Sequence, residues 1–249
     1  MRILEFGTPG SPVLILIHGF EMPWQLLFPC IGRYKTSYHI LVPVLPGHDV
    51  KEPSEFTSFE DIARELEDFC LSQTGDHVAV VYGLSMGGLV AARLWQNGRL
   101  TIGRLIMESS PILPFPGFAV KQMTRTYLKL TQKARERDPG TLQKAAGTMI
   151  PPDQLDMLLS LLDGISDSTV EAYTRQVGEY ALPGDLEPGG TRLVYFYGSR
   201  LAELPFRKAA GFLESHYPGT KTVCLRGKGH CEDALLWPER WLRHIAPYL

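Results

Sequence analysis

Residues 78–94, VAVVYGLSMGGLVAARL, contain the transition that decides the fold. The run begins with apolar, mostly β-branched residues, which is typical of a buried strand. The residues that follow Ser85 are small and aliphatic at helical spacing, which predicts a helix starting near Met86. Ser85 therefore lies between Gly83 and Gly87 at a sharp strand-to-helix turn. Such a turn strains the serine backbone, and the glycines omit Cβ atoms that would clash with the neighbouring strand and helix.

Similar apolar runs, bounded by glycine, proline or polar residues, recur along the chain. These runs predict strands that are buried on both faces, as in parallel sheets. Helical patterns separate them, most clearly over 58–73 with Ser58 as its N-cap. This alternation predicts a doubly wound, mostly parallel α/β sheet, with residues 1–6 as an edge strand. The expected strands cover residues 13–18, 38–44, 77–82, 104–109, 192–198 and 221–227.

The alternation stops between about residues 112 and 182, within a segment over 112–189. This stretch has no strand-like run but contains helix-like pieces punctuated by proline and glycine. It is too long for a simple crossover, so we expect a helical cap inserted in a core made of 1–111 and 190–249. The helical pieces cover residues 118–137, 141–150, 151–164 and 167–182, and residues 182–190 form the returning loop.

Composition excludes several classes of protein. The 249 residues carry a net charge of −2, so no nucleic-acid partner is expected. No apolar run approaches the roughly 18 residues of a membrane span, and the N-terminus lacks a signal-peptide pattern. The four cysteines form no CxxC pair, which indicates reduced thiols and a cytoplasmic location. We expect no integral membrane association, and the oligomeric state stays open.

Ser85 in the G-x-S-x-G pattern is the candidate nucleophile, and it needs a base. His230 follows the last expected strand and precedes a C-terminal helix over 237–249, which places it at the same sheet edge as Ser85. His18 ends the first buried strand and is expected to brace its loop. The backbone amides of Phe20 and Met86 are the expected oxyanion donors.

These residues resemble the α/β-hydrolase family. The resemblance rests on HGF (18–20), PGHD (46–49), GLSMGG (83–88) and GKGH (227–230), each after an expected strand. It implies an α/β-hydrolase fold with a variable helical cap, a Ser-His-acid triad, and neither cofactor nor metal. Small bacterial esterases, monoglyceride-lipase-like and thioesterase-like members are the most similar types.

One departure concerns the acid of the triad. Family members usually carry an aspartate in a G-x-x-D pattern after the strand over 192–198, where this chain has Leu201. Glu203 follows two residues later and is the preferred acid, unless it is a solvated loop charge. Glu108, after the preceding strand, is the alternative, and a reduced or absent acid is the third.

Two functions remain open. The first is a serine hydrolase that cleaves a carboxylic ester or related acyl bond through an acyl-enzyme, on a small-molecule substrate with an apolar group. A serine at the turn argues against the epoxide hydrolases and haloalkane dehalogenases of this family, which use an aspartate there. The second is a ligand-binding or sensor protein with weak or vestigial activity, because a fold does not determine a function.

Overall fold

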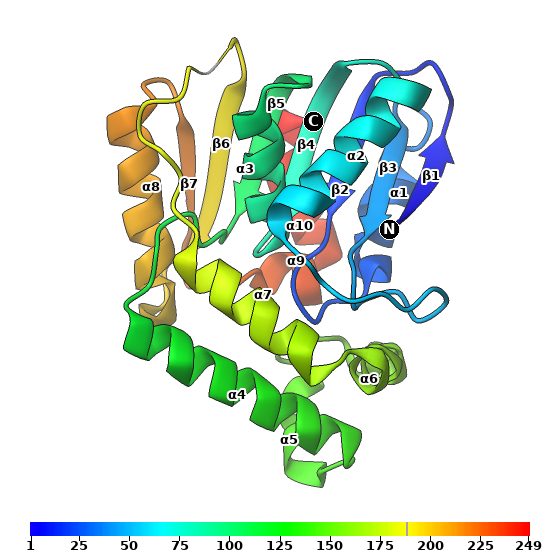
Figure 1. The fold of residues 1–249 in the computed structure, drawn as a ribbon, viewed down its shortest axis with the longest axis vertical. Coiled ribbons are helices and arrows are strands. Elements are labelled where there is room, and N and C mark those ends of the chain that lie inside the picture. The colour runs from blue at the N-terminus through cyan, green and yellow to red at the C-terminus, as the bar shows by residue number, and fades with distance from the viewer. Residues whose placement is uncertain (188) are drawn as a thin grey trace.

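The computed structural model describes residues 1–187 and 189–249, which include a seven-stranded sheet in the order β1-β3-β2-β4-β5-β6-β7 (Figure 1). β1 pairs antiparallel with β3 at one edge, and the remaining neighbours pair in parallel. The predicted α/β sheet and its edge strand are therefore confirmed. The strands are β1 (Arg2–Gly7), β2 (Val13–Ile17), β3 (His39–Val44), β4 (His77–Leu84), β5 (Thr101–Glu108), β6 (Arg192–Gly198) and β7 (Lys221–Leu225).

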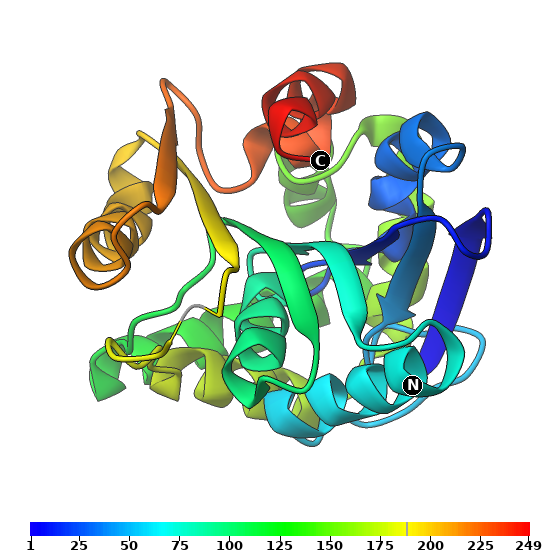
Figure 2. The ribbon, with the colours of Figure 1, turned by 90° about the horizontal axis from the view of Figure 1, so that it is seen from above.

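Helices cover both faces of the sheet, as Figure 2 shows from above. On one face lie α2 (Phe59–Gln73), α3 (Gly87–Asn97) and α8 (Leu204–His216), and on the other α1 (Phe28–Tyr34), α9 (Glu232–Leu236) and α10 (Pro238–Ile245). Ser58 caps α2 as expected, because its side chain accepts a hydrogen bond from the Asp61 amide. Short 3₁₀ turns cover Trp24–Leu27, Pro152–Gln154, Leu201–Glu203 and Ala246–Tyr248.

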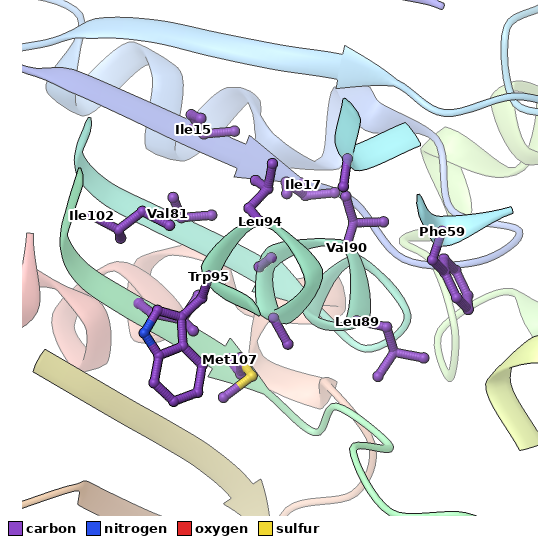
Figure 3. Packing of buried hydrophobic residues seen from close by; sticks show 14 of the residues in the cluster. Ile15, Ile17, Phe59, Val81, Leu89, Val90, Leu94, Trp95, Ile102 and Met107 are labelled. Carbon is purple, nitrogen blue, oxygen red and sulfur yellow. The ribbon is translucent and has the colours of Figure 1, made fainter. Parts of the chain in front are cut away.

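The strands are buried on both faces because successive side chains point to opposite sides. In β2, Ile15 and Ile17 pack towards α2 and α3, whereas Leu14 and Leu16 pack towards α1 and α10. Figure 3 shows Ile15 and Ile17 near the side chains of α3, including Val90. Each such buried aliphatic side chain contributes about 1.5–3 kcal/mol to folding. This packing fixes the position at which α3 begins, and hence that of the turn before it.

Between β5 and β6 the chain forms α4 (Gly117–Arg135), α5 (Pro139–Ala145), α6 (Leu155–Gly164) and α7 (Asp167–Glu179), which lie beyond the carboxyl ends of the strands (Figure 1). The helix expected over 141–150 is shorter than predicted. Gly147 adopts φ +82° and its amide donates to the Ile150 carbonyl at 2.7 Å, which turns the chain after α5. Of the loop expected over 182–190, residue 188 lies outside the described residues.

Two expectations from composition concern the membrane and the thiols. In residues 1–187 and 189–249 no helix is both long and apolar enough to cross a bilayer. All four cysteines are free thiols, and Cys30, Cys70 and Cys231 are buried whereas Cys224 is exposed.

Candidate active site

Ser85 occupies the turn between β4 and α3 in the left-handed region, with φ +53°, which is rare and strained for a residue with a side chain. Its amide donates to the Glu108 carbonyl at 2.7 Å, which holds the turn against β5. A Cβ at Gly83 would lie 2.5 Å from the Gly87 carbonyl oxygen, and one at Gly87 would lie 2.4 Å from that of His18. The two glycines therefore allow the helix to start this close to the sheet.

His230 lies on the loop between β7 and α9, and its Nε2 atom is 2.7 Å from Ser85 Oγ. The serine hydroxyl can donate to this nitrogen when the imidazole is neutral and carries its proton on Nδ1. The ring packs beside Phe206, with centroids 4.8 Å apart, and its side chain is 38% exposed. A base is thus within hydrogen-bond reach of the candidate nucleophile and accessible from solvent.

Glu203 ends the 3₁₀ turn after β6 and faces the other side of the same imidazole. Its Oε1 atom is 3.5 Å from His230 Nδ1. Its Oε2 atom accepts hydrogen bonds from Ser109 Oγ at 2.9 Å and from the Gly198 amide at 3.2 Å. The side chain is only 1% exposed, so Glu203 is not a solvated loop charge.

The contacts of Glu203 favour its ionised form. Burial acts to raise the pKa of this carboxyl, but His230, Ser109 and the Gly198 amide together hold it below its usual range. A buried carboxylate therefore lies beside the imidazole.

Glu108 ends β5 and is also buried, but it has different partners. Its Oε2 atom accepts from the Tyr82 hydroxyl at 2.6 Å, and that hydroxyl accepts from the Trp241 indole at 2.8 Å. Burial raises the pKa of Glu108 to about 7. Within the part of the chain that the structure describes, no hydrogen bond or ion pair joins its carboxyl to His230. The structure brings Glu203, and not Glu108, to the imidazole.

The loop after β2 is held by two buried histidines. His18 Nε2 accepts from the Leu45 amide at 3.1 Å, and His48 Nε2 accepts from the Glu21 amide at 2.9 Å. Burial lowers the pKa of His18 to about 4 and that of His48 to about 3, so both rings are neutral at pH 7. His18 therefore braces the loop that carries Phe20, in agreement with the sequence interpretation.

Phe20, Ser85 and His230 line a cavity of about 250 Å³. Met86 directly follows Ser85 and is buried. The end of β2 and the start of α3 lie side by side, as the close approach of Gly87 to the His18 carbonyl shows. The roles of the Phe20 and Met86 amides as oxyanion donors stay predictions.

Two residues that sequence reasoning missed also lie at this site. Ser109 directly follows β5 and binds Glu203, and its position after a parallel strand was the available signal. Glu21 follows Phe20 and lines the cavity, but one acidic residue in a loop carries no pattern. In the described ranges, no cluster of His, Cys, Asp or Glu is arranged to hold a metal ion.

Comparisons with known proteins identify the family of the chain. The model of the alpha/beta hydrolase family matches residues 14–246. The pimeloyl acyl-carrier-protein methyl ester esterase of Proteus mirabilis is 24% identical over 244 residues, which cover 89% of this chain and 86% of that protein. Epoxide hydrolase A of Mycobacterium tuberculosis is 28% identical over 142 residues, which cover 55% of this chain and only 40% of that protein.

A thermophilic esterase from Thermogutta terrifontis has the same fold, with a TM-score of 0.76 at 19% identity over 99% of this chain and 92% of that chain. The family match spans nearly the whole sheet and the helices inserted in it. The prediction of a hydrolase with this fold is confirmed. The chain belongs to the alpha/beta hydrolase family.

Proposed function

We propose that the protein is a serine hydrolase that cleaves carboxylic esters through Ser85, His230 and Glu203. The observation that carries this proposal is the 2.7 Å contact between Ser85 Oγ and His230 Nε2, with the buried Glu203 carboxyl on the opposite side of the ring. This order of serine, imidazole and carboxyl is the one that acyl transfer uses, and it supports the proposal.

In this mechanism Ser85 Oγ attacks the ester carbonyl while His230 Nε2 takes its proton. The imidazolium that forms is stabilised by ionised Glu203, which is why the hydrogen bonds from Ser109 and Gly198 matter. The oxyanion is stabilised by the amides of Phe20 and Met86. His230 then protonates the leaving alcohol. A water molecule, deprotonated by the same ring, releases the acid from the acyl-enzyme.

The residues that line the cavity favour a substrate ester with an apolar group. Apolar residues line it, from the loop after β2, from α9 and from the helices inserted after β5, and they include Met22, Tyr127, Ile150, Leu158 and Leu235. Two of the similar proteins named above are esterases by name. We propose that the segment from α4 to α7 forms a cap that selects the substrate, since α4, the loop after α5 and α6 supply one side of this lining.

The sensor hypothesis rested on the unusual position of the acid. The ionised Glu203 beside His230 removes that reason, because a displaced acid that reaches the imidazole supports turnover. We therefore favour the hydrolase over the sensor.

The test is the substitution Ser85→Ala. Removal of a lone nucleophile costs on the order of 10⁶ in kcat in a well-studied serine protease, so hydrolysis of 4-nitrophenyl butyrate and labelling by a fluorophosphonate should both vanish. The matched control is Ser72→Ala, which removes an exposed hydroxyl on α2 and should retain both signals. Labelling that persisted in the Ser85→Ala protein would assign the nucleophile to another residue.

A further inference from the structure

Glu21 is a buried acid that the proposed reaction does not use. It follows Phe20 in the loop after β2 and has φ +50°, a strained conformation for a residue with a side chain. Its amide donates to His48 Nε2, which holds the backbone in this conformation. Strain of this kind persists where the surrounding structure imposes it, often at a ligand site.

The Glu21 carboxyl has little support from the protein. Its side chain is 8% exposed, and Oε1 accepts from Thr131 Oγ1 of α4 at 2.6 Å. Arg135 lies close enough to act on the pKa of Glu21. Its guanidinium, however, donates to the carbonyls of Leu162 and Ile165 and to the Asp167 carboxyl. No ion pair reaches Glu21 from the residues described here. Burial raises its pKa to about 7, against the opposing effects of Thr131 and Arg135.

Glu21 lines two neighbouring cavities. It lines the cavity of about 250 Å³ that holds Ser85, and also a larger one of about 710 Å³ between α4, α5 and α6. Tyr127, Met149 and Leu158 line both cavities as well. Glu21 is therefore part of the boundary between the two cavities, and a substrate chain that crosses from one to the other meets its carboxyl.

The chemistry around Glu21 decides which group fits there. An alkyl group would leave a buried carboxyl partly unpaired, which is costly. A cation is disfavoured because basic side chains line the larger cavity, namely Arg125, Lys129, Lys133 and Lys144. A second carboxylate would meet the negative charge of ionised Glu21. A hydroxyl both donates and accepts, so it can pair with this carboxyl in either protonation state.

We propose that Glu21 is a specificity-determining residue that selects esters bearing a hydroxyl group on the part of the chain that enters the larger cavity. This inference rests on the proposed ester hydrolysis. Thr131 and His48 act as positioning residues, because they hold the carboxyl and the backbone of Glu21. The larger cavity takes the remaining, apolar part of the chain.

The experiment compares kcat/KM for ethyl hexanoate with that for three hydroxylated esters: ethyl 3-hydroxyhexanoate, ethyl 6-hydroxyhexanoate and 2-hydroxyethyl hexanoate. Proton release at pH 8 measures turnover. In the wild type at least one hydroxylated ester should exceed ethyl hexanoate by about tenfold or more, since a site built to bind a hydroxyl discriminates against its absence. The third ester tells whether the hydroxyl lies on the alcohol side.

The variants separate recognition from a structural role. Glu21→Met should reduce the ratio to about one, whereas Glu21→Gln, whose amide donates and accepts, should retain most of it. Thr131→Val removes the hydrogen bond that holds this carboxyl, so the ratio should fall to a value between those of the wild type and of Glu21→Met. The ratio is measured on one preparation, so a loss of folded protein does not change it.

Two results would overturn the inference while leaving the proposed function intact. One is a ratio near one for every hydroxylated ester in a wild type whose activity depends on Ser85. The other is a preference that survives Glu21→Met. If instead the wild type cleaved none of these esters, or Ser85→Ala remained active, the proposed function would fail and this inference with it.

Discussion

Glu203 and Glu108 are two buried glutamates that follow or end neighbouring parallel strands, yet their environments favour opposite charge states. Glu203 meets an imidazole, a hydroxyl and an amide, and its pKa falls below the usual range. Glu108 meets the Tyr82 hydroxyl and lies near the carboxyls of Asp233 and Glu203, and burial raises its pKa to about 7. Each is about 1% exposed, so burial alone does not decide the charge. Hydrogen-bond donors and neighbouring charges therefore set the charge state of each buried glutamate.

The largest expected difference between the two is catalytic. Glu203→Gln keeps the volume but loses the charge that stabilises the imidazolium, and it can favour the wrong tautomer of His230. The corresponding change costs about 10⁴ in kcat in a serine protease, so we expect a loss of that order with an activated ester at pH 8. Glu108→Gln, measured in parallel, should retain kcat within a few-fold.

The opposite pattern of kcat losses in the two variants would contradict this expectation. A large loss for Glu108→Gln with nearly normal Glu203→Gln would assign the acid to β5. Small losses in both variants would indicate a Ser85–His230 site without an acid and would revive the sensor hypothesis.

A smaller loss of kcat is expected when the hydrogen bond between Ser109 and Glu203 is removed. Ser109→Ala removes the 2.9 Å hydrogen bond to Glu203 but leaves the Gly198 amide in place. Loss of one donor to a carboxylate should reduce kcat by about tenfold, with little change in KM. Ser110→Ala is the matched control, because its hydroxyl contacts a backbone carbonyl and not Glu203. An equal loss in both variants would mean that the loop, and not the hydrogen bond, was disturbed.

The pH dependence of stability is also expected to differ between the two glutamates. Folding raises the pKa of Glu108 from 4.5 to about 7, so between these values the unfolded chain loses a proton that the folded chain keeps. Its contribution to stability therefore declines as pH rises through this window, by about 3 kcal/mol in total. Glu108→Gln removes this decline, so the stability of the variant relative to wild type should improve from pH 5 to pH 8.

Urea unfolding of both variants at pH 5 and pH 8 checks this sign. The lowered pKa of Glu203 makes its contribution present above the unfolded value and lost only as pH falls through the folded value. Glu203→Gln should accordingly show no comparable change between pH 5 and pH 8. If the relative stability of Glu108→Gln did not improve with pH, Glu108 would be ionised in the folded protein.

Much of the fold followed from local pattern. The continuous apolar runs of strands buried on both faces, the cap at Ser58 and the glycines around Ser85 are short-range features, and the structure has them as expected. The helix expected to reach residue 150 ended at Ala145 instead, because Gly147 takes a left-handed conformation that helical propensity does not register. Local physics therefore predicted the elements better than their ends.

The sequence by itself determined the sheet, the turn that carries Ser85 and the edge at which His230 lies, because parallel strands end at a common edge and the motifs follow them in order. Only the tertiary structure shows that Glu203, and not Glu108, lies beside His230, since these positions depend on contacts between residues far apart in the chain. The environment of Glu21 is likewise set by tertiary structure, because Thr131, which donates to its carboxyl, lies 110 positions away in the chain. Long-range packing sets such contacts, and with them the charge of a buried acid, and no local pattern encodes it.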